Sequence, residues 1–143
     1  MIARLEQNDI EEVGDIWLSN NITAHFFIPD SYWKQNLLDV KKAMLEAEVY
    51  IFQEEEKILG FIGLEQENIA GIFVRAENQS QGIGKQLLDF CKQKRIKLIL
   101  NVYQKNPRAI QFYQREGFEI IQEGIDEQTG EKEYQMIWKR KNG

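Results

Sequence analysis

Residues 79–85 read Gln-Ser-Gln-Gly-Ile-Gly-Lys, a composition suited to binding an anion. A short apolar run precedes them and a helical pattern follows, so the two glycines stand where a helix begins. The first amides of a helix have no partner within it and carry partial positive charge, which attracts anions. Glycines let a phosphate approach these amides closely, so the segment predicts either a phosphate cradle or a plain turn.

Two familiar nucleotide-binding loops do not fit these residues. A P-loop has an earlier glycine and a serine or threonine after its lysine, but here Gln86 follows Lys85. A dinucleotide loop has a third glycine or alanine where this chain has Leu87. The alternatives that remain are a phosphate cradle without a metal ion and a structural turn.

Two helices are predicted in the N-terminal part of the chain. Asn8 or Asp9, with Glu12 at a capping-box position, is expected to start a helix that ends near residue 20. The apolar spacing predicts a second helix over residues 30–46. These helices precede the strands that lead to the glycine segment.

Two more helices are predicted after the glycine segment begins. The spacing from Ile83 onward places Cys91 on the buried face of the first one. Asn106 and Pro107 form a cap and first turn for the second, and Gly117 is suited to ending it.

The remaining apolar runs predict strands, and the order of elements predicts the fold class. The chain is expected to be one α/β (α+β) domain over residues 1–143, with about four helices on both faces of a seven-stranded, mostly antiparallel sheet. The strand–helix–strand arrangement around the glycine segment predicts one parallel pair in the centre. The expected strands span residues 2–5, 49–53, 58–64, 69–74, 97–103, 118–124 and 134–139.

Composition excludes several classes of function. The net charge of −5 without a basic patch argues against nucleic acid and mildly favours a cationic or amine acceptor. A single cysteine allows neither an internal disulfide nor a thiolate metal site, and no metal is expected. No apolar stretch approaches the roughly 20 residues that cross a bilayer, and no signal peptide is evident, so a cytoplasmic protein without a membrane partner is expected.

Oligomeric state stays open between monomer and homodimer. Tyr134, Met136 and Trp138 alternate on one face of the last strand. This apolar face can either pack on the core or form a dimer seam.

Two segments resemble signatures of one family. Gln79-Ser80-Gln81-Gly82-Ile83-Gly84 is similar to the Gln/Arg-x-x-Gly-x-Gly/Ala signature of the GNAT superfamily of acyl-CoA-dependent N-acyltransferases. Residues 106–118, Asn-Pro-Arg-Ala-Ile-Gln-Phe-Tyr followed by Gly117-Phe118, resemble the family's second signature. The order of elements also resembles the family's, so the resemblance covers essentially the whole chain.

The resemblance implies a cofactor and a reaction. It implies an enzyme that transfers an acetyl group from acetyl-CoA directly to a primary amine of a small molecule or a protein. The alternative is a non-catalytic coenzyme A sensor or regulatory module, because no strand carboxylate is present at positions 70 or 71 to act as a base. The residues that the resemblance places at the cofactor are Ile72, Phe73, Val74, Gln79, Gln81, Gly82, Ile83, Gly84, Lys85 and Asn106.

Tyr113 is the general acid that the resemblance implies. A phenol with a pKa near 10 can protonate the coenzyme A thiolate as it leaves. Packing within its helix is the other interpretation. The buried Cys91, with no histidine near it in sequence, argues against a covalent enzyme intermediate.

The resemblance also implies where the acceptor pocket lies. In the family its wall lies between the two N-terminal helices, where this chain has its only histidine, His25, together with Phe26 and Tyr32. Each of these residues can also be purely structural. The general base is not identified; Glu65 on the neighbouring strand, or a relay through water, is possible.

Overall fold

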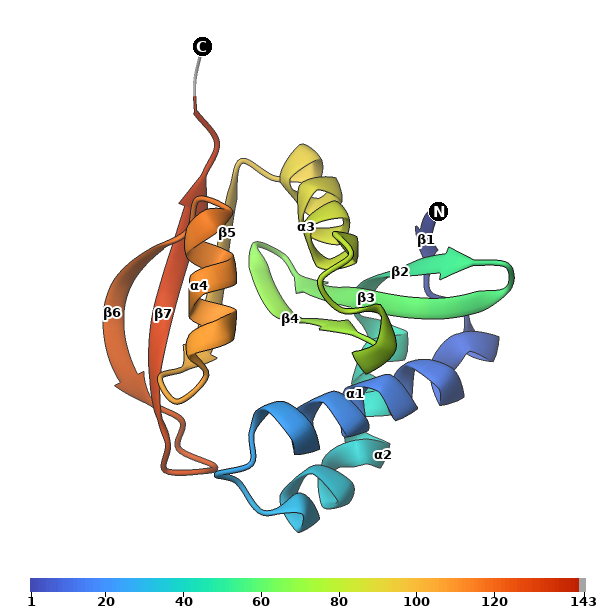
Figure 1. The fold of residues 1–143 in the computed structure, drawn as a ribbon, viewed down its shortest axis with the longest axis horizontal. Coiled ribbons are helices and arrows are strands. Elements are labelled where there is room, and N and C mark those ends of the chain that lie inside the picture. Colours follow the sequence, from blue (N-terminus) through green and yellow to red (C-terminus); the bar gives the residue numbers. More distant parts are fainter. Residues whose placement is uncertain (142–143) are drawn as a thin grey trace.

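The computed structural model describes residues 1–141, which form one seven-stranded sheet with helices on both faces (Figure 1). The strand order is β1-β2-β3-β4-β5-β7-β6, and every neighbouring pair is antiparallel except β4 and β5. The predicted α/β architecture with one parallel pair in the centre is therefore confirmed. The strands are β1 Ile2–Arg4, β2 Glu48–Glu54, β3 Lys57–Glu65, β4 Asn68–Val74, β5 Lys97–Tyr103, β6 Glu119–Ile125 and β7 Lys132–Lys139.

Four α-helices cover the sheet. Helices α1 and α2 lie against one face of β2–β4, while α3 and α4 lie on the opposite side (Figure 1). Two short 3-10 turns, Gln7–Asp9 and Ala76–Asn78, precede α1 and α3. The helices are α1 Ile10–Ala24, α2 Asp30–Glu46, α3 Ile83–Lys94 and α4 Pro107–Arg115.

The start of α1 differs from the predicted capping box. Asp9 has helical dihedral angles and does not cap α1; its carboxylate accepts from the amide of Glu6 at 2.9 Å instead. Glu12 is drawn away by tertiary contacts, since its carboxylate accepts from Arg75 at 2.7 Å and from the amide of Ile58 at 2.9 Å. The helix also extends to Ala24, past the predicted end near residue 20.

Apolar residues form a core on each face of the sheet. On the α3 and α4 side, Leu87, Cys91 and Met136 are fully buried, so the predicted burial of Cys91 is confirmed. Tyr134 and Trp138 pack against the same cluster. The alternating face of the last strand thus packs on the core.

Strands β4 and β5 stay together at only one end. Their single paired position is Asn68 opposite Ile99, and beyond it no pairing joins them among residues 1–141. A shift in register between β3 and β4 leaves Ala70 as an extra residue, the pattern of a β-bulge. The two halves of the sheet therefore diverge in the middle, with α3 on one side of the opening and α4 on the other (Figure 1).

Candidate active site

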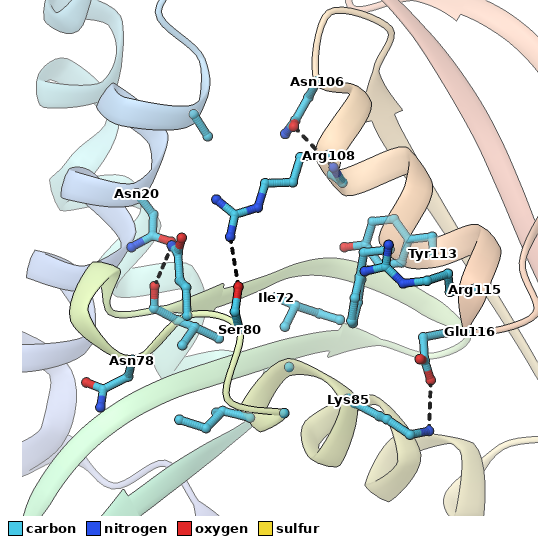
Figure 2. A pocket seen from close by; sticks show the side chains of 18 residues that line it. Asn20, Ile72, Asn78, Ser80, Lys85, Asn106, Arg108, Tyr113, Arg115 and Glu116 are labelled. Atoms are coloured by element: carbon cyan, nitrogen blue, oxygen red, sulfur yellow. Dashed lines mark hydrogen bonds and ion pairs between the residues drawn. The ribbon is translucent and has the colours of Figure 1, made fainter.

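A pocket of about 550 Å³ lies where the sheet opens. It is lined by the loop before α3, by β4, by α4 and by the last turns of α1 (Figure 2). Both glycines of the predicted cradle line it, as do Asn106 and Tyr113. The fold thus brings together the two segments that resemble family signatures.

The loop before α3 exposes backbone amides at the pocket. Gly82 is the N-cap residue in a left-handed conformation, with φ 85°, which a glycine adopts at little cost. Its carbonyl accepts from Gln86 at 3.0 Å, so the amides of residues 83–85 precede the first helical hydrogen bond. Within residues 1–141 these three amides donate to no acceptor, as a cradle for phosphate oxygens requires.

Gln79 holds the loop in place. Its side-chain amide donates to the carbonyl of Val74 at 3.1 Å and lies 3.5 Å from Oδ1 of Asn20 on α1. Nearby, the Oδ1 of Asn78 is buried at the pocket and finds no donor in the described part of the chain. The loop amides without acceptors fit a group that carries phosphates, as coenzyme A does.

The side chains of Lys85 and Gln81 have partners outside the loop amides. Lys85 forms ion pairs with Glu116 at 3.1 Å and with Asp89 at 3.2 Å. Hydrogen bonds to these two carboxylates raise the pKa of the exposed ammonium above its ordinary value. Gln81 is exposed, and its side-chain amide lies 3.5 Å from the carbonyl of Glu77.

Strand β4 presents alternate residues to the pocket. The amide of Arg75 donates to Leu59 on β3 at 2.8 Å, so by the alternation of antiparallel pairs the backbone of Phe73 also faces β3. The backbone groups of Ile72 and Val74 therefore face the opening, and both residues line the pocket. Phe73 differs from the prediction: its ring belongs to the α1 and α2 core and stacks on Phe61 with centroids 5.0 Å apart.

Tyr113 lies on the inner side of α4. The tyrosine is 8 % exposed and packs against Phe112 and Phe118, and its hydroxyl points into the pocket (Figure 2). Within residues 1–141 the hydroxyl makes no hydrogen bond. Burial raises the pKa of the Tyr113 phenol above its usual value, so the group is protonated at neutral pH.

Asn106 and His25 join α4 to α1. The Oδ1 of Asn106 accepts from the amide of Ala109 at 3.3 Å, which confirms the predicted cap. The amide nitrogen of Asn106 lies 3.3 Å from Nε2 of His25, and Nδ1 of His25 lies 3.0 Å from Oδ1 of Asn21. Burial lowers the pKa of His25 to about 4, so the ring is neutral at pH 7.

None of the four predicted acceptor residues, His25, Phe26, Tyr32 and Glu65, is among the residues that line this pocket. Phe26 is 81 % exposed. Tyr32 donates to Gln128 at 2.7 Å, at a smaller cavity between the α1–α2 loop and the β6–β7 loop. Glu65 lines a separate, mostly apolar cavity of about 260 Å³ on the α2 side of β4, together with Gly71.

Sequence reasoning missed several polar residues at the pocket. Asn20, Ser80 and Arg108 all line it. Ser80 and Arg108 fall inside the two family-like segments, but nothing in their spacing indicated that they meet. Asn20 had no local signal, because only the packing of α1 against the loop brings it there.

A family model described as an acetyltransferase (GNAT) domain matches residues 46–120. The chain belongs to the GNAT acetyltransferases. GNAT acetyltransferases take acetyl-CoA as cofactor, and this chain is accordingly an acetyl-CoA-dependent N-acetyltransferase.

Several relatives carry names that describe the same activity. The chain is 33 % identical over 140 residues to the peptidyl-lysine N-acetyltransferase YiaC of Escherichia coli (strain K12), covering 96 % of each chain. It is 26 % identical over 121 residues to the peptidyl-lysine N-acetyltransferase YjaB of the same strain, covering 83 % of this chain and 82 % of YjaB. These names favour an enzyme over the non-catalytic alternative.

Solved structures share the fold. The solution structure of YjaB from Escherichia coli superposes with a TM-score of 0.85 at 21 % identity, over 99 % of this chain and 98 % of that one. PaiA N-acetyltransferase from Thermoplasma acidophilum, solved with coenzyme A, gives a TM-score of 0.80 at 17 % identity, over 97 % and 98 % of the two chains. The seven-stranded sheet that opens between β4 and β5 is thus a GNAT fold.

Residues 1–141 lack two features. No helix there combines the length and the apolar character that crossing a membrane requires. In the same residues, no three histidine, cysteine or acidic side chains gather as metal ligands would.

Proposed function

We propose that this GNAT acetyltransferase acetylates the ε-amino group of lysine side chains in proteins. The observation that carries the proposal is the 33 % identity to the peptidyl-lysine N-acetyltransferase YiaC over 96 % of both chains. The net charge of −5 supports it, because an acidic protein attracts a lysine-bearing partner. We further propose that residues 1–143 act as one domain in the cytoplasm.

The loop before α3 and strand β4 would hold the cofactor. Acetyl-CoA supplies the acetyl group as a thioester, and its transfer to an amine releases the coenzyme A thiol. The amides of Ile83, Gly84 and Lys85 would bind the pyrophosphate, with Gln79 keeping the loop in shape. The backbone groups of Ile72 and Val74 would bind the pantetheine arm, and a donor there would stabilise charge on the thioester oxygen.

Tyr113 would act as the general acid. Its raised pKa keeps the phenol protonated at neutral pH, so a proton is present in the pocket for the leaving group. The coenzyme A thiolate would take this proton as the thioester bond breaks, and the hydroxyl has no competing partner within residues 1–141. Asn106 would contact the cofactor beside it while capping α4.

No side chain is proposed as general base. Both ring nitrogens of His25 already lie within hydrogen-bond distance of Asn21 and Asn106, so its basic nitrogen is occupied. Glu65 lines a different cavity from Tyr113. We therefore propose that the amine loses its proton to water.

The test is an acetylation assay with matched acceptors. The purified chain is incubated with acetyl-CoA and a lysine-containing peptide, the same peptide with arginine at that position, a polyamine or an aminoglycoside. Release of free thiol and a mass gain of one acetyl group on the lysine peptide alone are the expected results. Acetylation of the polyamine or aminoglycoside, with the lysine peptide unchanged, would overturn the proposed acceptor.

A further inference from the structure

A side-chain contact crosses the pocket from α4 to the loop before α3. Nη2 of Arg108, in the first turn of α4, donates to Oγ of Ser80 at 3.2 Å. Figure 2 shows the arginine reaching away from its helix toward the loop. Both residues line the pocket, and Ser80 precedes the N-cap glycine of α3 by only two positions.

The charge of Arg108 is not neutralised by this contact. Among the described residues, no carboxylate lies within ion-pair distance of its guanidinium, and the serine hydroxyl is its one hydrogen-bond partner. By contrast, Lys85 on the other side of the pocket is paired with Glu116 and Asp89. Arg108 is thus a charged group at the pocket with most of its donors unused, since a guanidinium has five N–H groups.

The geometry suits a phosphate. A guanidinium binds phosphate oxygens in a bidentate manner, and this pair is stronger than a bond to a neutral hydroxyl. Ser80 has φ 65°, a left-handed conformation, and it stands three residues before Ile83, the first of the unpaired amides. A phosphate bound at those amides would therefore lie near Ser80 Oγ, the atom that the guanidinium of Arg108 now contacts.

We propose that Arg108 is a cofactor-binding residue that exchanges its contact with Ser80 for the pyrophosphate of coenzyme A. It would close the pocket over the cofactor from the α4 side, while the backbone amides bind the same phosphates from the α3 side. This inference rests on the proposed cofactor site. It adds a charged side chain that the backbone cradle lacks.

The test compares three ligands in titration calorimetry. Coenzyme A carries the pyrophosphate and a 3′-phosphate, 3′-dephospho-coenzyme A keeps only the pyrophosphate, and pantetheine has neither. Arg108→Gln is expected to raise the Kd for the first two ligands by about tenfold to a hundredfold, the range for a hydrogen bond to a charged group. It should leave the weak binding of pantetheine unchanged.

Two further variants serve as controls. Arg108→Lys keeps the charge without the bidentate geometry and should restore part of the affinity. Lys34→Gln removes one positive charge from the exposed surface of α2, away from the pocket, and should leave the Kd unchanged. Because Arg108 is exposed, the melting temperature of Arg108→Gln should match that of the unchanged protein.

Three results would overturn the inference while leaving the proposed function intact. The first is an unchanged Kd for coenzyme A in Arg108→Gln. The second is a loss that disappears with 3′-dephospho-coenzyme A, since this assigns Arg108 to the 3′-phosphate. The third is an equal loss in Lys34→Gln, which indicates only general attraction. Failure of the unchanged protein to bind coenzyme A would instead refute the cofactor site itself.

Discussion

Replacing Tyr113 by phenylalanine should separate catalysis from stability. The substitution removes one hydroxyl oxygen and leaves the ring, which packs against Phe112 and Phe118. Within residues 1–141 that hydroxyl makes no hydrogen bond, so its loss leaves no partner unsatisfied. The free energy of unfolding should therefore change by less than about 1 kcal/mol, or rise slightly because a buried polar group is removed.

The effect on turnover should be much larger. A positioned general acid contributes about 10²–10⁴-fold, which corresponds to about 3–5 kcal/mol of the activation barrier. Because the pKa of Tyr113 is raised, its proton stays on the phenol through neutral and mildly alkaline pH. The fall in kcat should accordingly be similar across the range from about pH 6 to 9, since the phenol does not titrate there.

The assay combines three measurements on the same two proteins. Thiol release with a lysine peptide gives kcat, calorimetry gives the Kd for coenzyme A, and thermal unfolding gives Tm. We expect a lower kcat with the Kd and Tm nearly unchanged. A kcat within about threefold of the unchanged protein would refute the acid role, because loss of a general acid should lower kcat at least about 10²-fold. A large fall in Tm that accompanies lost activity would show that the hydroxyl is structural.

Three other predictions follow from the geometry. Gly82→Ala should lower the free energy of unfolding by about 1–2 kcal/mol. The added Cβ would meet nothing within 4 Å, so the cost comes from the left-handed backbone alone. Gly124→Ala, equally open and without a positive φ, should be near neutral in the same denaturant titration. The pKa of His25 is lowered to about 4 in the folded protein, so the unfolded chain takes up this proton first, near pH 6.5. Stability should then fall as pH drops from about 6.5 toward 4, and His25→Gln should flatten that part of a Tm-against-pH curve; an unchanged slope would exclude His25 as its source. Burial raises the pKa of the Cys91 thiol to about 12, so a thiol reagent should label it only after unfolding. The Cys91→Ala variant should still transfer acetyl groups. Abolished transfer in a folded Cys91→Ala variant would contradict direct transfer.

Much of the fold and half of the site follow from short-range patterns. The cap of α4 by Asn106 depends on residues within one helical turn, so the local sequence predicts it. The burial of Cys91 follows from helical spacing, which is also local. Local patterns were misleading at Asp9 and Glu12, where contacts to Glu6 and to Arg75 replaced the predicted capping box.

The rest of the site was decided by where the strands diverge. Whether Ile72 or Phe73 turns its backbone toward the opening depends on the pairing of β4 with β3 and on the bulge at Ala70. Likewise, the contact of Arg108 with Ser80 exists only because the opening between β4 and β5 brings α4 opposite the loop before α3. Local propensity acts over a few residues, whereas these contacts join segments far apart in the chain. The sequence by itself therefore determined the type of cofactor, and the tertiary structure determined which side chains line the pocket.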